Sequence, residues 1–147
     1  LGLMLHDPEE EHDCFSDNTH NSHYYNVVGI NNVFLGKYKN LDGKVVTGPS
    51  ISSLLSEVDY DLNKKTKKSI KNTLKSMKKI VKSANKGVTY DMLIAEGNEK
   101  GNKLIQNAVD SLIKQSKNIE LAAAALNIND LQIEGSDSLD NPDAVFN

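Results

Sequence analysis

The sequence predicts an all-α protein, an up-and-down helical bundle of three long helices with shorter ones between them. Apolar residues recur at helical spacing in three long segments, no segment alternates as a strand would, and turn and capping residues separate the segments. A chain of 147 residues is long enough to bury one core. We expect the bundle to occupy residues 1–128 and an irregular tail to occupy residues 129–147.

Composition excludes several classes of protein. The 17 basic residues, all lysines, nearly balance 20 acidic residues, so the net charge of -3 does not indicate a nucleic-acid partner. No apolar run reaches the roughly 18 to 20 residues that cross a bilayer, so we expect no membrane-spanning segment. A single cysteine cannot form an internal disulfide.

The first segment is expected to be interrupted early. Residues 1–5 resemble the end of a helix that begins upstream, which suggests the C-terminal part of a longer protein, and Pro8 should break that helix. Residues 9–15 then form a loop or single turn. Ser16 or Asp17 is predicted to cap a helix reaching about residue 38. Within it, glycines 29 and 36 lie seven apart and would let another helix approach closely.

The remaining elements follow from local signals. Residues 40–43 form a turn, and Ser50 is expected to cap a short helix over 51–58. Asp59 should cap a helix over 60–84 that ends at Lys86-Gly87. Its predicted buried line is Leu62, Thr66, Ile70, Leu74, Met77, Val81 and Ala84.

The C-terminal third is predicted to hold a short apolar turn or helix at 89–95 and a last long helix. That helix should begin after Gly97 or beyond Gly101 and end near Leu126. Its predicted buried stripe is Leu104, Ala108, Leu112, Ile119, Ala122 or Ala123, and Leu126. The Asp-, Asn-, Ser- and Gly-rich residues after it predict the irregular tail.

Chemistry concentrates in residues 6–25, which hold all four histidines, the only cysteine and six carboxylates, without a lysine. Imidazole and carboxylate together suit divalent metals such as iron or zinc. Asp17, His20 and Tyr24 stand at i, i+3 and i+7, and would share one face of the helix. Glu11 and His12 lie just before, on a loop that could fold back over the helix end.

Plainer interpretations stand beside this one. Asp17 could simply cap the helix, with the glutamates and histidines solvated. Cys14 is expected to be a small buried side chain rather than a nucleophile paired with His12 or His20. His6 and Glu9 spell H-x-x-E, but Pro8 makes a shared helical face a chance match. The lysines of residues 64–86 have no interleaved aromatic residue or arginine and predict a solvated face.

The stretch EEEHDCFSDNTH, residues 9–20, resembles a signature in the C-terminal half of imelysin-like proteins, the iron-regulated protein A group. The resemblance continues through residues 25–38 and 48–54 and the alanine-rich residues 122–126. It implies a protein of two similar helical bundles in the periplasm, or on the outer membrane, of a Gram-negative bacterium, linked to iron uptake. Some members are labelled metallopeptidases.

The family's G-x-H-x-x-E motif lies in the N-terminal half, and this chain does not contain it. The resemblance therefore implies half of a site for a divalent metal ion (iron or zinc) or a metal-bearing ligand, completed by the N-terminal half as partner. The expected metal ligands are His12 and His20, helped by Asp17 and Glu11. The expected ligand contacts at the positive end of the helix are Ser16, Asn18 and Thr19. The alternative function is a zinc-dependent peptidase whose main motif is in the other half.

Overall fold

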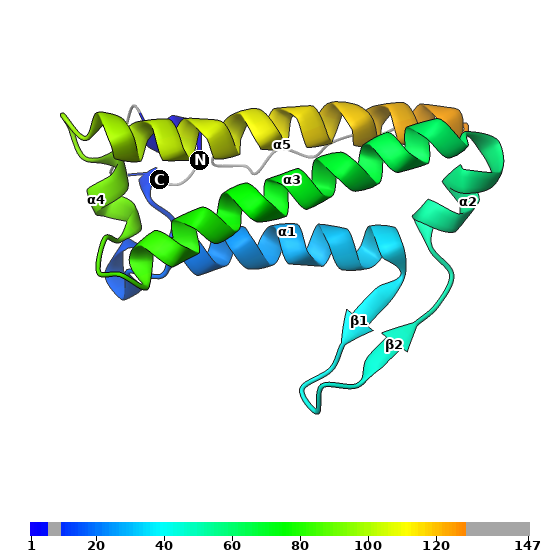
Figure 1. The fold of residues 1–147 in the computed structure, drawn as a ribbon, viewed down its shortest axis with the longest axis horizontal. Helices are drawn as coiled ribbons and strands as arrows, with labels where there is room; N and C mark the ends of the chain where they lie inside the picture. Colours follow the sequence, from blue (N-terminus) through cyan, green and yellow to red (C-terminus); the bar gives the residue numbers. More distant parts are fainter. Residues whose placement is uncertain (6–9, 129–147) are drawn as a thin grey trace, which may run out of the picture.

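The structure is a computed structural model that describes residues 1–5 and 10–128. Figure 1 shows a mostly helical chain, as the sequence predicted, together with one small hairpin. The elements, in chain order, are η1 (Leu3–Leu5), η3 (Cys14–Ser16), α1 (Thr19–Leu35), β1 (Lys37–Lys39), β2 (Val45–Thr47), α2 (Ile51–Val58), α3 (Tyr60–Ala84), α4 (Tyr90–Ile94) and α5 (Glu99–Ala125). The predicted tail and the pair His6 and Glu9 lie outside the described residues.

Helix α3 is the centre of the bundle, because it packs against α1 on one side and α5 on the other. The three long helices run up, down and up, and α4 crosses the end where α1 and α5 begin (Figure 1). This arrangement confirms the predicted all-α, up-and-down bundle. Among the described helices, none is both long and apolar enough to cross a membrane.

Local capping signals fixed the boundaries of α2 and α3 as expected. The Ser50 side chain accepts a hydrogen bond from the Ser53 backbone N–H at 2.9 Å and starts α2. Asp59 accepts one from the Leu62 N–H at 2.8 Å and starts α3. Helix α5 begins at Glu99, between the two predicted starting points, where Asn98 accepts from the Gly101 N–H at 2.9 Å.

The bounds predicted for α1 were wrong at both ends. The helix starts at Thr19, because Asp17 adopts a left-handed conformation (φ 51°), and it stops at Leu35. Gly36 takes φ 58° and ends it, and a Cβ there would lie 2.6 Å from the carbonyl oxygens of Gly48 and Pro49. Gly36 therefore ends the helix. Gly29 is exposed, and a Cβ placed there would meet no atom within 4 Å, so no helix of the described part of the chain packs against it.

Residues 37–47 form an antiparallel hairpin that the sequence did not predict. Tyr38 pairs with Val46, and the turn closes at Gly43, whose N–H donates to the Asn40 carbonyl at 3.0 Å. Every strand residue is exposed, so neither strand shows the buried-and-exposed alternation that would reveal it in a sequence. The hairpin projects from the bundle (Figure 1).

The core consists of two apolar clusters, one at each end of α3. The cluster near α4 contains Met4, Val27, Met77, Ile80, Tyr90, Leu93, Ile94, Ile105 and Ala108. The cluster near α2 contains Phe34, Leu55, Ile70 and Ala122. The buried face of α3 also carries polar side chains that its predicted apolar line did not include: Asn63, Ser69 and Thr73 are buried, as is the predicted Thr66.

Candidate functional site

The site lies where the loop before α1 folds back over the start of that helix. Thr19 anchors the loop, because its hydroxyl accepts a hydrogen bond from the Asp13 backbone N–H at 3.1 Å. The Ser22 hydroxyl donates to the Asp13 carboxylate. These bonds bring Glu11 and His12 back against the second turn of α1.

Three buried polar side chains gather at this place. Glu11 and His23 are each 8% exposed, and Tyr90 at the start of α4 is 0% exposed. The His23 ring lies between two others, with centroid separations of 5.2 Å to His12 and 5.7 Å to Tyr90. Glu11 Oε1, His23 Nε2 and the Tyr90 hydroxyl have no hydrogen-bond partner among the described residues. Buried polar atoms are rarely left without one, so this cluster has unused binding capacity.

Burial sets the protonation of the cluster. Burial is the main cause that lowers the pKa of His23 to about 4, and His12 adds to the lowering while Asp13 opposes it. Burial also raises the pKa of the Tyr90 phenol, and the Glu11 charge adds to that rise. At neutral pH the cluster therefore holds a neutral imidazole, able to donate a nitrogen lone pair, beside a protonated phenol.

The residues predicted to contact a ligand at the helix N-terminus mostly face water. Ser16, Asp17 and Asn18 are exposed. The Ser16 hydroxyl donates to the Asp13 carbonyl oxygen at 3.2 Å, and the Asn18 side chain accepts from Asn21 at 2.8 Å. Thr19 is fully buried and anchors the loop. Cys14 was expected to be buried but is exposed, because it begins η3, a short turn without any buried residue.

The predicted metal ligands separate into two groups. Glu11 and His12 join the buried cluster, Glu11 within it and His12 at its exposed rim. His20 is half-buried, with its Nε2 3.3 Å from the Asn21 amide and its buried Nδ1 unpartnered. Asp17 makes no hydrogen bond to His20 among the described residues. No hydrogen bond to His20 therefore supports the expected contribution of Asp17 to a metal site.

Carboxylate, imidazole and phenol are donors that suit iron or zinc, and one of each is buried and unpartnered here. Within residues 1–5 and 10–128, however, no three His, Cys, Asp or Glu side chains stand close enough to hold a metal ion together. The described residues thus fit part of a metal site, and further ligands would have to complete it.

His23 and Tyr90 were not among the predicted site residues. Helical spacing could have identified His23, because Thr19, His23 and Val27 stand four apart and all three are buried. A histidine in an otherwise inward-facing line is the signal. Tyr90 comes from a distant part of the chain, and only the packing of α4 across the bundle end brings it to His23.

A comparison with known families assigns the chain. The family model described as Imelysin, which bears the name peptidase M75, matches residues 1–119. Among curated proteins, none matches the chain. The family match covers most of the sequence, including the whole loop, α1 and α4. The chain therefore belongs to the imelysin family.

Proposed function

We propose that the buried cluster of Glu11, His23 and Tyr90, with His12 at its rim, is one side of a site for a divalent metal ion, iron or zinc, or for a metal-bearing ligand. The observation that carries the proposal is the presence of three buried polar atoms without partners on side chains that lie at the same end of the bundle. Leaving such atoms unpaired costs about 1–3 kcal/mol each, so a native structure keeps them where a ligand satisfies them.

The N-terminal half of the protein is proposed to supply the remaining ligands. The described residues supply too few donors to hold a metal ion by themselves, and the imelysin-like resemblance places a G-x-H-x-x-E motif in that other half. His20, with an unpartnered nitrogen near the same helix end, is the remaining candidate on this side. Ser16, Asp17, Asn18 and Thr19 are proposed to frame the site rather than to ligate.

The biological setting belongs to the same proposal. Membership of the imelysin family favours an iron-regulated protein of the periplasm, or of the outer membrane surface, that takes part in iron uptake. Metal or ligand binding is favoured over catalysis. The described residues of the site supply buried or neutral donor groups, and they do not pair a general acid with a general base.

Metal titration tests the site. Fe(II) and Zn(II) binding would be measured by calorimetry on this chain and on the protein extended to include the N-terminal half. Tight stoichiometric binding is expected for the extended protein, and binding at least 100-fold weaker is expected for this chain. Equal affinity for the two would contradict a shared site.

Substitutions then locate the ligands. In the extended protein, Glu11→Gln and His23→Gln are expected to weaken metal binding at least tenfold, while Glu120→Gln, an exposed carboxylate on α5, should not. Circular dichroism controls for folding. Unchanged affinity in both site variants would remove the cluster from the function. Peptide hydrolysis that a chelator abolishes would favour the peptidase alternative.

A further inference from the structure

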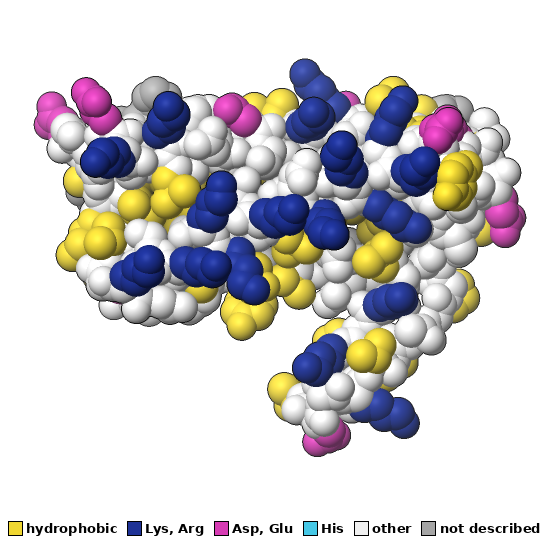
Figure 2. Space-filling view, in the orientation of Figure 1, with side chains coloured by type: hydrophobic (Ala, Val, Ile, Leu, Met, Phe, Trp, Pro, Cys, Tyr) yellow, Lys and Arg dark blue, Asp and Glu magenta, His cyan; other side chains and the backbone are white. Residues whose placement is uncertain are grey.

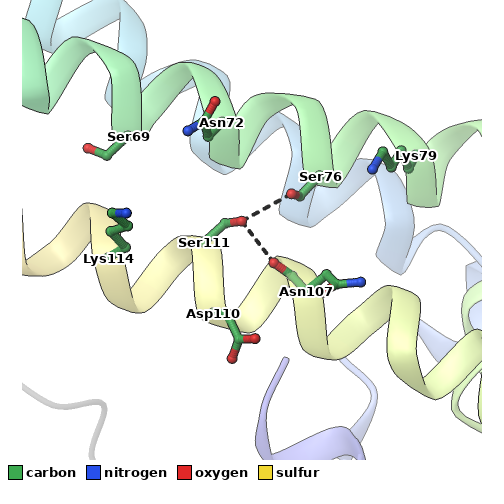
Figure 3. A pocket seen from close by; sticks show the side chains of 8 residues that line it. All are labelled: Ser69, Asn72, Ser76, Lys79, Asn107, Asp110, Ser111 and Lys114. Atoms are coloured by element: carbon green, nitrogen blue, oxygen red, sulfur yellow. Dashed lines mark hydrogen bonds between the residues drawn. The ribbon is translucent and has the colours of Figure 1, made fainter.

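A groove runs along the outer side of the contact between α3 and α5, away from the cluster of Glu11, His23 and Tyr90. It has a volume of about 430 Å³, within the size range of ligand sites. Figure 3 shows hydroxyl, amide and charged side chains facing one another across it. They are contributed by α3 (Ser69, Asn72, Ser76 and Lys79) and by α5 (Asn107, Asp110, Ser111 and Lys114).

Small side chains create this groove. The Thr73 hydroxyl donates to the Ser111 backbone carbonyl across the interface at 3.1 Å, and the Ser76 and Ser111 hydroxyls lie 3.1 Å apart. These short residues bring the helices together and leave the space above them empty. The side-chain amides of Asn72 and Asn107 make no hydrogen bond within the described part of the chain, so they are free to bind a ligand.

The groove continues into a basic hollow on α3. Lys75, Lys78, Lys79 and Lys82 line a second space of about 240 Å³, and Lys79 belongs to both spaces. Figure 2 shows this face, with lysines along α3 and acidic side chains mainly at its margins. Among the described residues, the only ion pair within 4.0 Å joins Lys64 and Asp61, so the groove lysines have no anionic partner.

We propose that this groove binds an acidic polysaccharide. The lysine ammonium groups would hold its carboxylates or sulfates, and the hydroxyl and amide groups of Ser69, Asn72 and Asn107 would hydrogen-bond its sugar hydroxyls. From Ser69 to Lys82 the helix rises about 20 Å at 1.5 Å per residue, so the surface accommodates an oligosaccharide rather than a single sugar.

The residues that line the groove and the basic hollow favour one class of anionic partner over others. Neither space is lined by an aromatic residue or an arginine, the groups on which nucleic-acid bases stack. Neither space exposes an apolar wedge that would enter a lipid bilayer, because the apolar surface at the hollow belongs to lysine stems. The two spaces together carry five lysines and one carboxylate, Asp110, so a chain of hydroxylated, negatively charged sugars matches them in net charge and in hydrogen-bonding groups.

Two charge-reversed variants test the location. Binding of an oligogalacturonate octamer and of a heparin octasaccharide would be measured by calorimetry at low salt, with neutral dextran as the blank. The triple variant Lys75→Glu, Lys79→Glu and Lys114→Glu is expected to lose at least tenfold in affinity. The triple variant Lys37→Glu, Lys39→Glu and Lys44→Glu changes the net charge equally on the hairpin and should lose less than threefold.

A neutral substitution separates groove binding from bulk charge. Asn72→Leu occupies the groove, removes no hydrogen bond seen in the structure and leaves the charge unchanged, so it should weaken octamer binding at least fivefold. Equal losses in the two triple variants, or no loss in Asn72→Leu, would overturn the proposal. So would tighter binding of single-stranded DNA or of anionic phospholipid vesicles with the same sensitivity to the groove variant.

Discussion

The imidazole of His23 packs against the phenol of Tyr90, with ring centroids 5.7 Å apart and planes inclined by 52°. One ring comes from α1 and the other from α4, so the contact closes the end of the bundle. Both side chains carry a buried polar atom without a partner. The same contact therefore packs the end of the bundle and leaves two polar atoms able to bind a ligand. The stability of this contact should depend on the charge of His23.

Acidification should weaken the fold through His23. Its folded-state pKa of about 4 lies below the ordinary value of 6.5. The unfolded chain therefore binds more protons between these values, and the free energy of unfolding should fall as pH drops through this window. We expect a loss of about 1–2 kcal/mol between pH 7 and pH 5, measured by urea denaturation. His23→Gln should reduce that loss, and an equal loss in the variant would contradict this account.

Gly36→Ala should destabilise the protein. A Cβ at φ 58° would meet two backbone carbonyl oxygens at 2.6 Å, and backbone cannot move aside as a flexible side chain can. The expected cost is about 2–4 kcal/mol in the free energy of unfolding, from the strained conformation plus the overlap. Gly29→Ala is the matched control. It lies in the exposed middle of α1 with open space around it and should stabilise by about 0.5–1 kcal/mol.

Gln115→Met should stabilise the bundle. Gln115 on α5 is 2% exposed and its Oε1 accepts no hydrogen bond from the described residues. A thioether of similar length removes that unsatisfied acceptor, with an expected gain of about 1–2 kcal/mol in thermal or urea unfolding. Gln106→Met, at an exposed position on the same helix, should change stability by less than about 0.5 kcal/mol. A loss in Gln115→Met would show that the amide is satisfied in solution.

Asp59→Ala should destabilise the protein by removing the cap at the start of α3. Asp59 ends one helix and begins the next, since its N–H donates to the Leu55 carbonyl at 2.7 Å and its carboxylate accepts from the Leu62 N–H at 2.8 Å. Losing the cap should cost about 1 kcal/mol, read from the urea midpoint at constant slope. Asp61→Ala, which loses only an exposed pairing with Lys64, is expected to cost less than half as much.

The parts of the fold that the sequence predicted are those with local causes. Ser50 and Asp59 cap through bonds to residues three positions away, so their roles are visible in a short window. Gly36 was misread, because the carbonyls that exclude a side chain there come from beyond the hairpin. Hydropathy alone ranks Thr73 and Ser69 as surface residues. They are buried because their small hydroxyl groups can bond to carbonyl oxygens of the preceding turn or of the facing helix.

The position of the loop before α1 was predicted from the sequence, while the assignment of the metal ligands stays a prediction. The loop of Glu11 and His12 does lie against α1, and His20 does lie near the helix start. Asp17 is exposed and has a left-handed backbone, and the helix starts one or two residues later than a cap at Asp17 or Ser16 would give. Tyr90 could not be foreseen, because its neighbours are set by tertiary packing.

At the base of the hairpin, the Gly48 N–H donates to the Gly36 carbonyl oxygen at 2.9 Å, next to the strand pair Lys37 and Thr47. The chain thus leaves and rejoins the bundle at nearly the same point, and the residues between contribute nothing to either apolar cluster. The tip of the hairpin at Leu41 is therefore a suitable site for an insertion. An epitope or fluorophore inserted there would report on the molecule without disturbing the helices, and its length is free to vary.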